Sequence, residues 1–234
     1  MRRRADVAVI ACVLGVVMVT APSLAAHAGA RCPSPPGMAA SLADVDGQTR
    51  LHWIDAQLSA TGRTARLWTW GWGIGIVAAT GANLIPLAFV APSDRVDWYT
   101  SAATTIVGLV PLLIAPLDVI GDSRALHARV VAEGNGSDAD VCRLLADAEA
   151  TLARDAQNQK DGQRWWLHVG NVALNAGVGL FLGLGFHHWG AGALNFASGT
   201  IIGEAIILTQ PTGSIGDFEH YRTNVIWAPS LTWR

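Results

Sequence analysis

The chain has 234 residues, of which 51% are hydrophobic and 15% are charged, and its formal net charge is −2. A soluble domain usually carries about 25% charged residues, and a nucleic-acid-binding domain carries excess positive charge, so these values argue against both classes. Charges gather in a few stretches and long tracts contain none, which indicates a membrane protein whose first partner is the lipid bilayer.

The N-terminus is typical of a secretory signal peptide, which we place at residues 1–30. A charged start (1–4) is followed by an apolar stretch (5–19) and by two A-x-A patterns, which end at Ala28 and Ala30. The alternative is an uncleaved signal anchor, but Pro22 and the small residues after it favour cleavage. Residues 1–30 are therefore left out of the expected fold.

The next two regions are an external segment (31–65) and a transmembrane hairpin (66–121). The external segment contains an amphipathic stretch with Leu42, Leu51 and Leu58 at roughly helical spacing, interrupted by Gly47. Residues 67–90 and 98–117 are each long and apolar enough for a spanning helix. Because their link is short, the two helices must be antiparallel neighbours.

The second half repeats this plan. An external connector (122–164) contains a second amphipathic helix, for which Asp138 is the expected N-cap. A second transmembrane hairpin (165–216) follows, with spans at 165–186 and 191–209, and an external tail (217–234) ends the chain. The predicted fold class is thus an all-α membrane protein with four transmembrane helices, arranged as two tandem helical hairpins in a parallel repeat.

Matching motifs at a fixed offset support a duplication. The segments Pro116-Leu117-Asp118-Val119-Ile120-Gly121-Asp122 and Pro211-Thr212-Gly213-Ser214-Ile215-Gly216-Asp217 are 95 positions apart, as are Thr105-Ile106-Val107-Gly108 and Thr200-Ile201-Ile202-Gly203. Shared membrane composition accounts for some apolar matches but not for Pro and Ile-Gly-Asp in one register. At the start of each hairpin, Arg66-Leu67-Trp68 corresponds to Arg164-Trp165-Trp166.

Two signals disagree about the orientation of the chain. The signal peptide places the connector and both ends of the mature chain outside, on the periplasmic side of a cell (inner) membrane. Twelve of the sixteen Lys and Arg residues then lie outside, whereas the positive-inside rule predicts the reverse. We follow the signal peptide, because its charged start orients the first segment and turns of a few residues hold few charges.

Cys32 and Cys142 are the cysteines that remain after signal cleavage, and both lie on the predicted external side. That compartment permits disulfides, so we expect a bond between them. It would close a loop of about 110 residues and stabilise the fold by about 4 kcal/mol. The alternative is two unrelated thiols.

Glu204 is the ionisable residue that lies well inside a predicted span, and such residues are functional candidates by default. His168, Asn171 and Asn175 follow i, i+3, i+7 spacing on the preceding span and share one face. Asn171 and Glu204 have about the same depth at 1.5 Å per residue, so we expect Glu204 to face this stripe. The site is either a proton-responsive or ligand-binding centre, or a hydrogen-bonded clasp between two helices.

The sequence shows no nucleophile motif, phosphate loop or metal-type cysteine spacing, so it predicts no catalytic residue, metal or cofactor. The favoured function is structural or accessory, with another envelope protein or a second copy of the chain as partner. The alternative is a small transporter or channel-like protein with an intramembrane site around Glu204. A symmetric transport path would equip both halves, yet the position equivalent to Glu204 is Leu109.

Overall fold

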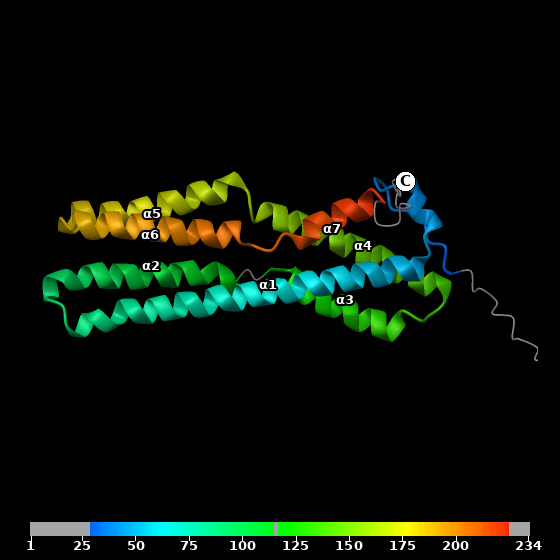
Figure 1. Ribbon diagram of the computed structural model, residues 1–234, viewed down its shortest axis with the longest axis horizontal. Coiled ribbons are helices and arrows are strands. Elements are labelled where there is room, and N and C mark those ends of the chain that lie inside the picture. Colours follow the sequence, from blue (N-terminus) through cyan, green and yellow to red (C-terminus); the bar gives the residue numbers. More distant parts are fainter. Residues whose placement is uncertain (1–28, 115–116, 225–234) are drawn as a thin grey trace, which may run out of the picture.

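The computed structural model describes residues 29–114 and 117–224, so the expected signal peptide lies outside them except for Gly29 and Ala30. All regular elements in this part are helical, which confirms the all-α prediction (Figure 1). The α-helices are α1 (Gly47–Leu84), α2 (Arg95–Ile114), α3 (Val119–Glu133), α4 (Asp138–Asp161), α5 (Trp165–Phe186), α6 (Trp189–Leu208) and α7 (Gly213–Arg222). Three 3₁₀ turns accompany them, at Ala40–Asp44, Ile85–Ala88 and Pro92–Asp94.

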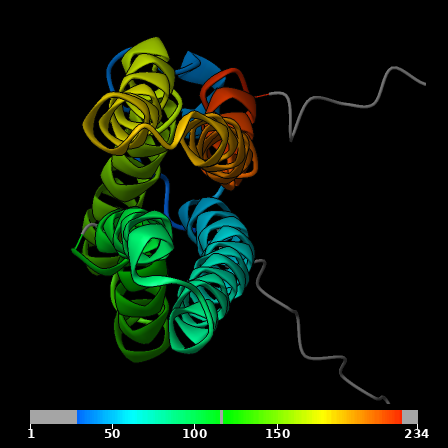
Figure 2. The ribbon, with the colours of Figure 1, turned by 90° about the vertical axis from the view of Figure 1, so that its left-hand side faces the viewer.

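The helices form two regions that follow one another along the long axis. The N-terminal half of α1 packs with α3, α4 and α7 into a bundle, which we call the head (Figure 1). The pairs α1–α2 and α5–α6 extend from the head as two helical hairpins, which we call the stem. Seen from its far end, the stem shows the two hairpins side by side (Figure 2).

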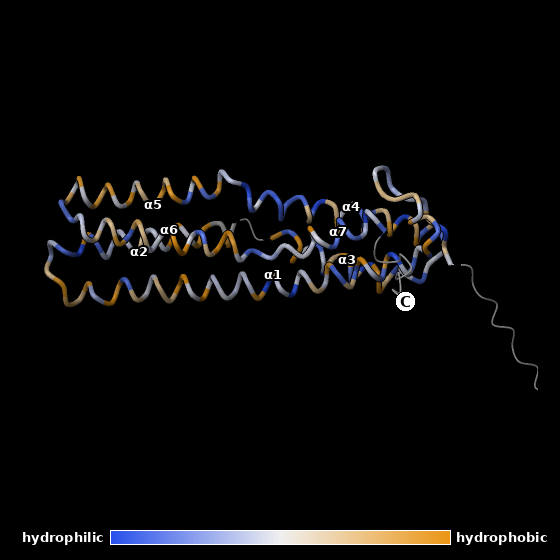
Figure 3. The backbone as a smooth tube through the Cα atoms, turned by 45° about the horizontal axis from the view of Figure 1, so that its top comes forward, coloured by the Kyte–Doolittle hydropathy of each residue, from blue (hydrophilic) through white to orange (hydrophobic). Residues whose placement is uncertain are grey.

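Hydropathy separates these regions. Hydrophobic residues dominate much of the stem, whereas the head mixes polar and apolar residues (Figure 3). Three helical segments in the described ranges are long and apolar enough to cross a membrane, namely Gly47–Ala88, Asp138–Phe186 and Trp189–Arg222. Large apolar side chains such as Leu67, Ile74 and Leu184 are more than half exposed on the stem, as expected where lipid is the solvent.

The core of the head is built by apolar stripes at helical spacing. Leu51, Ile54 and Leu58 of α1 are fully buried against Leu144 and Leu152 of α4 and their neighbours. A fully buried leucine stabilises a fold by roughly 1.5–3 kcal/mol. The head is therefore a packed domain and not a loose cap.

The helix boundaries correct two sequence predictions. The amphipathic stretch and the first apolar tract form one continuous helix, because no breaker separates them after Asp46 caps the start by accepting the Thr49 N–H at 2.9 Å. In the connector, Ser137 and not Asp138 is the N-cap, since its hydroxyl accepts the Asp140 N–H.

The head also contains four helical segments, whereas the sequence led us to expect two. The segment Val119–Glu133 of the expected connector forms α3, and the start of the expected tail belongs to α7. Both helices contain the Ile-Gly-Asp motif within their first turns. Sequence reasoning did not predict these two helices, because charged residues flank their apolar positions.

Candidate functional site

The predicted polar site lies between α5 and α6, which approach closely through glycine. A Cβ added at Gly179 would lie 2.9 Å from the carbonyl oxygen of Gly192, and one at Gly192 would lie 2.5 Å from that of Gly179. Small residues allow such an approach between helices in lipid. The hairpin is closed beyond them by His187, whose φ of 59° is left-handed.

The structure brings together all four residues that the sequence singled out. His168 Nδ1 lies 2.5 Å from Glu204 Oε2, and Asn171 Nδ2 donates to Glu204 Oε1 at 2.9 Å. Asn171 Nδ2 also donates to the Thr200 carbonyl at 3.0 Å. One turn further along, Asn175 Nδ2 donates to Asn171 Oδ1 at 2.9 Å. Both carboxylate oxygens of Glu204 thus have partners on α5.

Two glycines of α6 make room for the amide side chains. A Cβ at Gly203 would lie 2.1 Å from Asn171 Oδ1, and a Cβ at Gly199 would lie 1.9 Å from Asn175 Oδ1. The Gly199-x-x-x-Gly203 spacing therefore accommodates the polar stripe of α5.

The burial of the four residues is uneven. Asn175 is 3% exposed, whereas the side chains of His168 and Glu204 are 32% and 27% exposed. The hydrogen bonds of Asn175 stay within α5, so Asn171 and His168 are the residues that fasten α5 to α6, and the Glu204 end of the stripe reaches the surface of the hairpin near the head.

A second group of polar contacts joins the two hairpins. His188 Nδ1 lies 2.7 Å from Asp97 Oδ1, and the Ser101 hydroxyl lies 2.9 Å from Asn195 Oδ1. At the end of the stem near the head, the indole N–H groups of Trp68 and Trp72 each donate to the Thr209 hydroxyl at 3.1 Å. Sequence reasoning missed these contacts, because the partners are 91 or more positions apart.

Of the cavities between the hairpins, two include asparagine side chains in their walls. One of about 270 Å³ is lined mostly by apolar groups together with Asn171 and Asn175. The other, of about 380 Å³, includes Asp97, Ser101 and Asn195 in its wall. Neither His168 nor Glu204 lines either cavity, so the carboxylate faces its α5 partners and not an open space.

The head contains a buried charge network that the sequence did not reveal. Arg50 is 0% exposed and pairs with Glu149, which also accepts a hydrogen bond from the Tyr221 hydroxyl. Arg50 Nε donates to the Tyr221 oxygen at 2.9 Å, and its Nη1 donates to the carbonyls of Cys32 and Leu42. Burial raises the pKa of Glu149, while its two partners oppose this shift.

The cysteine pair lies beside this network. Cys32 Sγ and Cys142 Sγ are 2.01 Å apart, which is the distance of a disulfide bond, as the sequence predicts. The bond ties the segment before α1 to the start of α4. Together with Arg50 it fastens the N-terminal segment to three helices.

A second buried carboxyl lies near the base of the head. Asp155 is 1% exposed, and burial, followed by the charge and hydrogen bond of Asp122, raises its pKa to about 7. Arg154 pairs with Asp122 at 2.6 Å and opposes the shift. Near neutral pH, the Asp155 carboxyl is therefore partly protonated.

No group of three His, Cys, Asp or Glu residues suited to a metal ion occurs in the part of the chain that the structure describes. Comparison with known proteins adds no assignment: no protein family, no curated protein and no solved structure matches the chain.

Proposed function

We propose that the chain is a four-span accessory protein of the cell membrane, with the stem in the bilayer and the head outside. The fourth span is α2, which lies antiparallel to α1 throughout the stem (Figure 1). Its 20 residues correspond to about 30 Å of helix, which is the thickness of a bilayer core.

Burial in the head supports the proposed duplication. Buried positions of α1 recur in α4 at a constant offset of 94 positions, one less than the offset of the motifs in the spans. The residues Leu51, Ile54, Asp55, Leu58, Thr61, Gly62 and Ala65 correspond to Leu145, Ala148, Glu149, Leu152, Asp155, Ala156 and Gln159, and all fourteen are buried. In each half, this helix packs on the Ile-Gly-Asp helix of the same half, α3 or α7.

The cysteine pair supports an external head. Disulfides persist in oxidising compartments and are rare in the cytosol. An external head agrees with the signal peptide. We give these two observations more weight than the excess of Lys and Arg residues on the same side. The burial of Ala30, whose carbonyl accepts the Gly47 N–H at 2.8 Å, favours signal cleavage after Ala28 and not after Ala30 itself.

One observation carries the accessory role. Both oxygens of Glu204 are bound by residues of the neighbouring helix, and the carboxylate lines neither of the two asparagine-lined cavities between the hairpins. A polar group satisfied in this way stabilises helix association in lipid. The site therefore acts as a clasp that fixes the second hairpin below a rigid head.

Replacement of Glu204 tests the clasp. Glu204→Gln keeps the shape and an amide oxygen for Asn171, so the purified protein should unfold within a few degrees of wild type. Glu204→Ala removes an acceptor of Asn171 Nδ2 and the partner of His168 Nδ1, so its thermal midpoint in detergent should fall further. If Gln and Ala are equally damaging, the charge and not the clasp is what matters.

A second candidate function rests on the cavity of about 380 Å³ between the hairpins. Asp97, Ser101 and Asn195 give its wall polar groups at membrane depth, which suits a small polar solute or a proton path. Proteoliposomes containing a pH-sensitive dye distinguish the two functions. Proton or solute flux that Asp97→Asn abolishes would overturn the accessory role, and absence of flux with the wild-type protein supports it.

A further inference from the structure

A basic groove lies on the head between α1 and α3. It has a volume of about 440 Å³, and its wall includes Arg63, Arg66 and Arg124 together with the hydroxyls of Ser59 and Ser123. Its one carboxylate, Asp55, is bound by His127 Nδ1 at 2.9 Å. The groove therefore presents three guanidinium groups with no free acid beside them.

The lack of acid partners is unusual for this chain. In residues 29–114 and 117–224, seven of the twelve Lys and Arg side chains pair with a carboxylate. Three of the five that do not are the arginines of the groove. Arg66 also has a buried Nε without a hydrogen-bond partner. Guanidinium groups with free donors favour phosphate.

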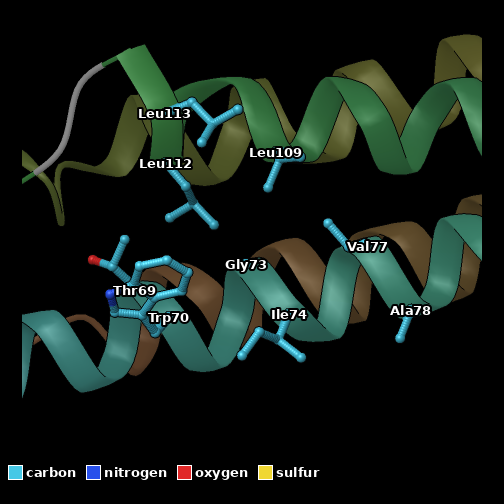
Figure 4. A pocket seen from close by; sticks show the side chains of 9 residues that line it. All are labelled: Thr69, Trp70, Gly73, Ile74, Val77, Ala78, Leu109, Leu112 and Leu113. Carbon is cyan, nitrogen blue, oxygen red and sulfur yellow. The ribbon is translucent and has the colours of Figure 1, made fainter.

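An apolar groove continues the basic groove along α1. It has a volume of about 440 Å³ and lies between α1 and α2 (Figure 4). Arg63, Arg66, Trp70, Gly73 and Val77 are spaced by three or four residues, so they follow one face of the helix. The first two belong to the basic groove and the last three to the apolar one.

In Figure 4, Leu109 and Leu112 of α2 face α1 across this groove, and Gly73 contributes no side chain to it. A Cβ added at Gly73 would meet no atom within 4 Å. The groove is thus open space between two helices that we place in lipid.

In the second half of the chain, the positions that correspond to the two grooves hold polar side chains that pair with one another. With the first and third spans aligned at Trp68 and Trp166, Trp70, Gly73 and Val77 correspond to His168, Asn171 and Asn175. At the 95-position offset of the second and fourth spans, Leu109 corresponds to Glu204. The four residues of the second half form the clasp. All four residues of the first set line the apolar groove. The place of an open groove in the first hairpin is therefore filled by hydrogen-bonded side chains in the second.

The basic groove has diverged in the same direction. At the 94-position offset of the head helices α1 and α4, Arg63 and Arg66 correspond to Gln157 and Lys160, and at the 95-position offset of the Ile-Gly-Asp motifs Arg124 corresponds to Glu219. Lys160 Nζ pairs with Glu219 Oε1 at 3.5 Å. One surface is thus neutralised by its own residues, whereas the other keeps three positive charges.

From these observations we infer that the first half binds one anionic phospholipid. Its phosphate lies among Arg63, Arg66 and Arg124, and one acyl chain lies between α1 and α2 along Gly73. The inference rests on the proposed membrane placement of the stem, which brings the basic groove to the level of the headgroups.

Lipid binding to the full, delipidated protein tests this inference. Native mass spectrometry in detergent should show phosphatidylglycerol bound more tightly than phosphatidylcholine. Joint replacement of Arg63, Arg66 and Arg124 by Gln should weaken phosphatidylglycerol about a hundredfold, at roughly fivefold per arginine. The matched control is Gln at Arg31, Arg95 and Arg143, which removes the same charge elsewhere. Equal binding by both triple variants would overturn the site.

A single exchange copies the neutral groove of the second half. Arg124→Glu gives Arg66 an acid partner, as Glu219 does for Lys160. We expect this variant to fold with unchanged stability and to lose its preference for phosphatidylglycerol. A preference retained by a folded Arg124→Glu protein contradicts the inference.

Filling the apolar groove separates a lipid from free phosphate. Gly73→Leu should weaken phosphatidylglycerol, whereas Gly71→Leu, which is equally uncrowded but outside the groove, should not. Displacement of the lipid by equimolar inorganic phosphate, or equal effects of both leucines, would reject the acyl-chain site. A protein that stays in solution without detergent would instead reject the membrane placement.

Discussion

The network around Arg50 provides the sharpest test of how the head is held together. Arg50 and Glu149 are 0% and 3% exposed, and the guanidinium contacts groups from four separate segments of the chain. Glu149→Ala leaves a positive charge in this core without its counter-charge. Breaking a buried pair in this way destabilises a protein by about 3–5 kcal/mol.

Two comparisons show whether charge is the cause. Replacement of Arg129, which pairs with Asp147 at the surface, should change stability by about 0–1 kcal/mol. Arg50→Met combined with Glu149→Leu should recover most of the loss, since well-packed apolar side chains often replace a buried pair without cost. Glu149→Leu alone fills the same space but leaves Arg50 without its counter-charge, so rescue by the double replacement and not by this single one identifies charge as the cause.

Hydrogen exchange measured by mass spectrometry gives the free energy of opening for head peptides. Peptides from α4 and the first half of α1 should lose protection in Glu149→Ala, while those from α5 and α6 should change little. The reasoning is refuted if the head loses less than about 1 kcal/mol, or if the double replacement is as unstable as the single one.

Three further predictions concern other contacts. Because the pKa of Asp155 is raised to about 7 in the folded protein, its contribution to stability falls as pH rises from about 4 to 7, so Asp155→Asn should raise the thermal midpoint at pH 8 but not at pH 4. Gly203→Ala should displace Asn171 and cost about 1–2 kcal/mol in a detergent unfolding assay, whereas Gly190→Ala, with open space around it, should not. Cys142→Ser should lower the stability of the head by about 4 kcal/mol in chemical denaturation, and an unchanged midpoint would show that the bond does not form.

Local patterns in the sequence were sufficient for much of the architecture. Long apolar tracts predict helices whatever they contact, and the shared depth of Asn171 and Glu204 follows from helix rise alone. The pairing of Cys32 with Cys142 was predictable because these are the two cysteines that remain after the predicted signal cleavage. The helices and the shared depth are fixed by spacing along the chain, whereas the cysteine pairing follows from the small number of thiols.

The remaining features depend on tertiary contacts. The sequence does not indicate that Arg50 is buried, because its acid partner is 99 positions away. α3 was also missed, although Val119, Leu126 and Val130 have helical spacing and are buried. Its periodicity was masked by exposed charges, and only its packing against α1 shows which face is internal.

The proposed duplication is the reason for considering the polar site and the groove together. In lipid, an open apolar groove carries no penalty, because an acyl chain fills it as well as a side chain does. A hydrogen-bonded clasp in the same place instead fixes two helices, because separating them would leave polar groups unpaired. Glu204 and Leu109 thus give two equivalent hairpins different tasks: the second is locked by its own side chains, and the first remains free to be completed by a lipid. On this view the asymmetry that weighs against a two-fold transport path is the feature that one rigid hairpin and one lipid-binding hairpin require.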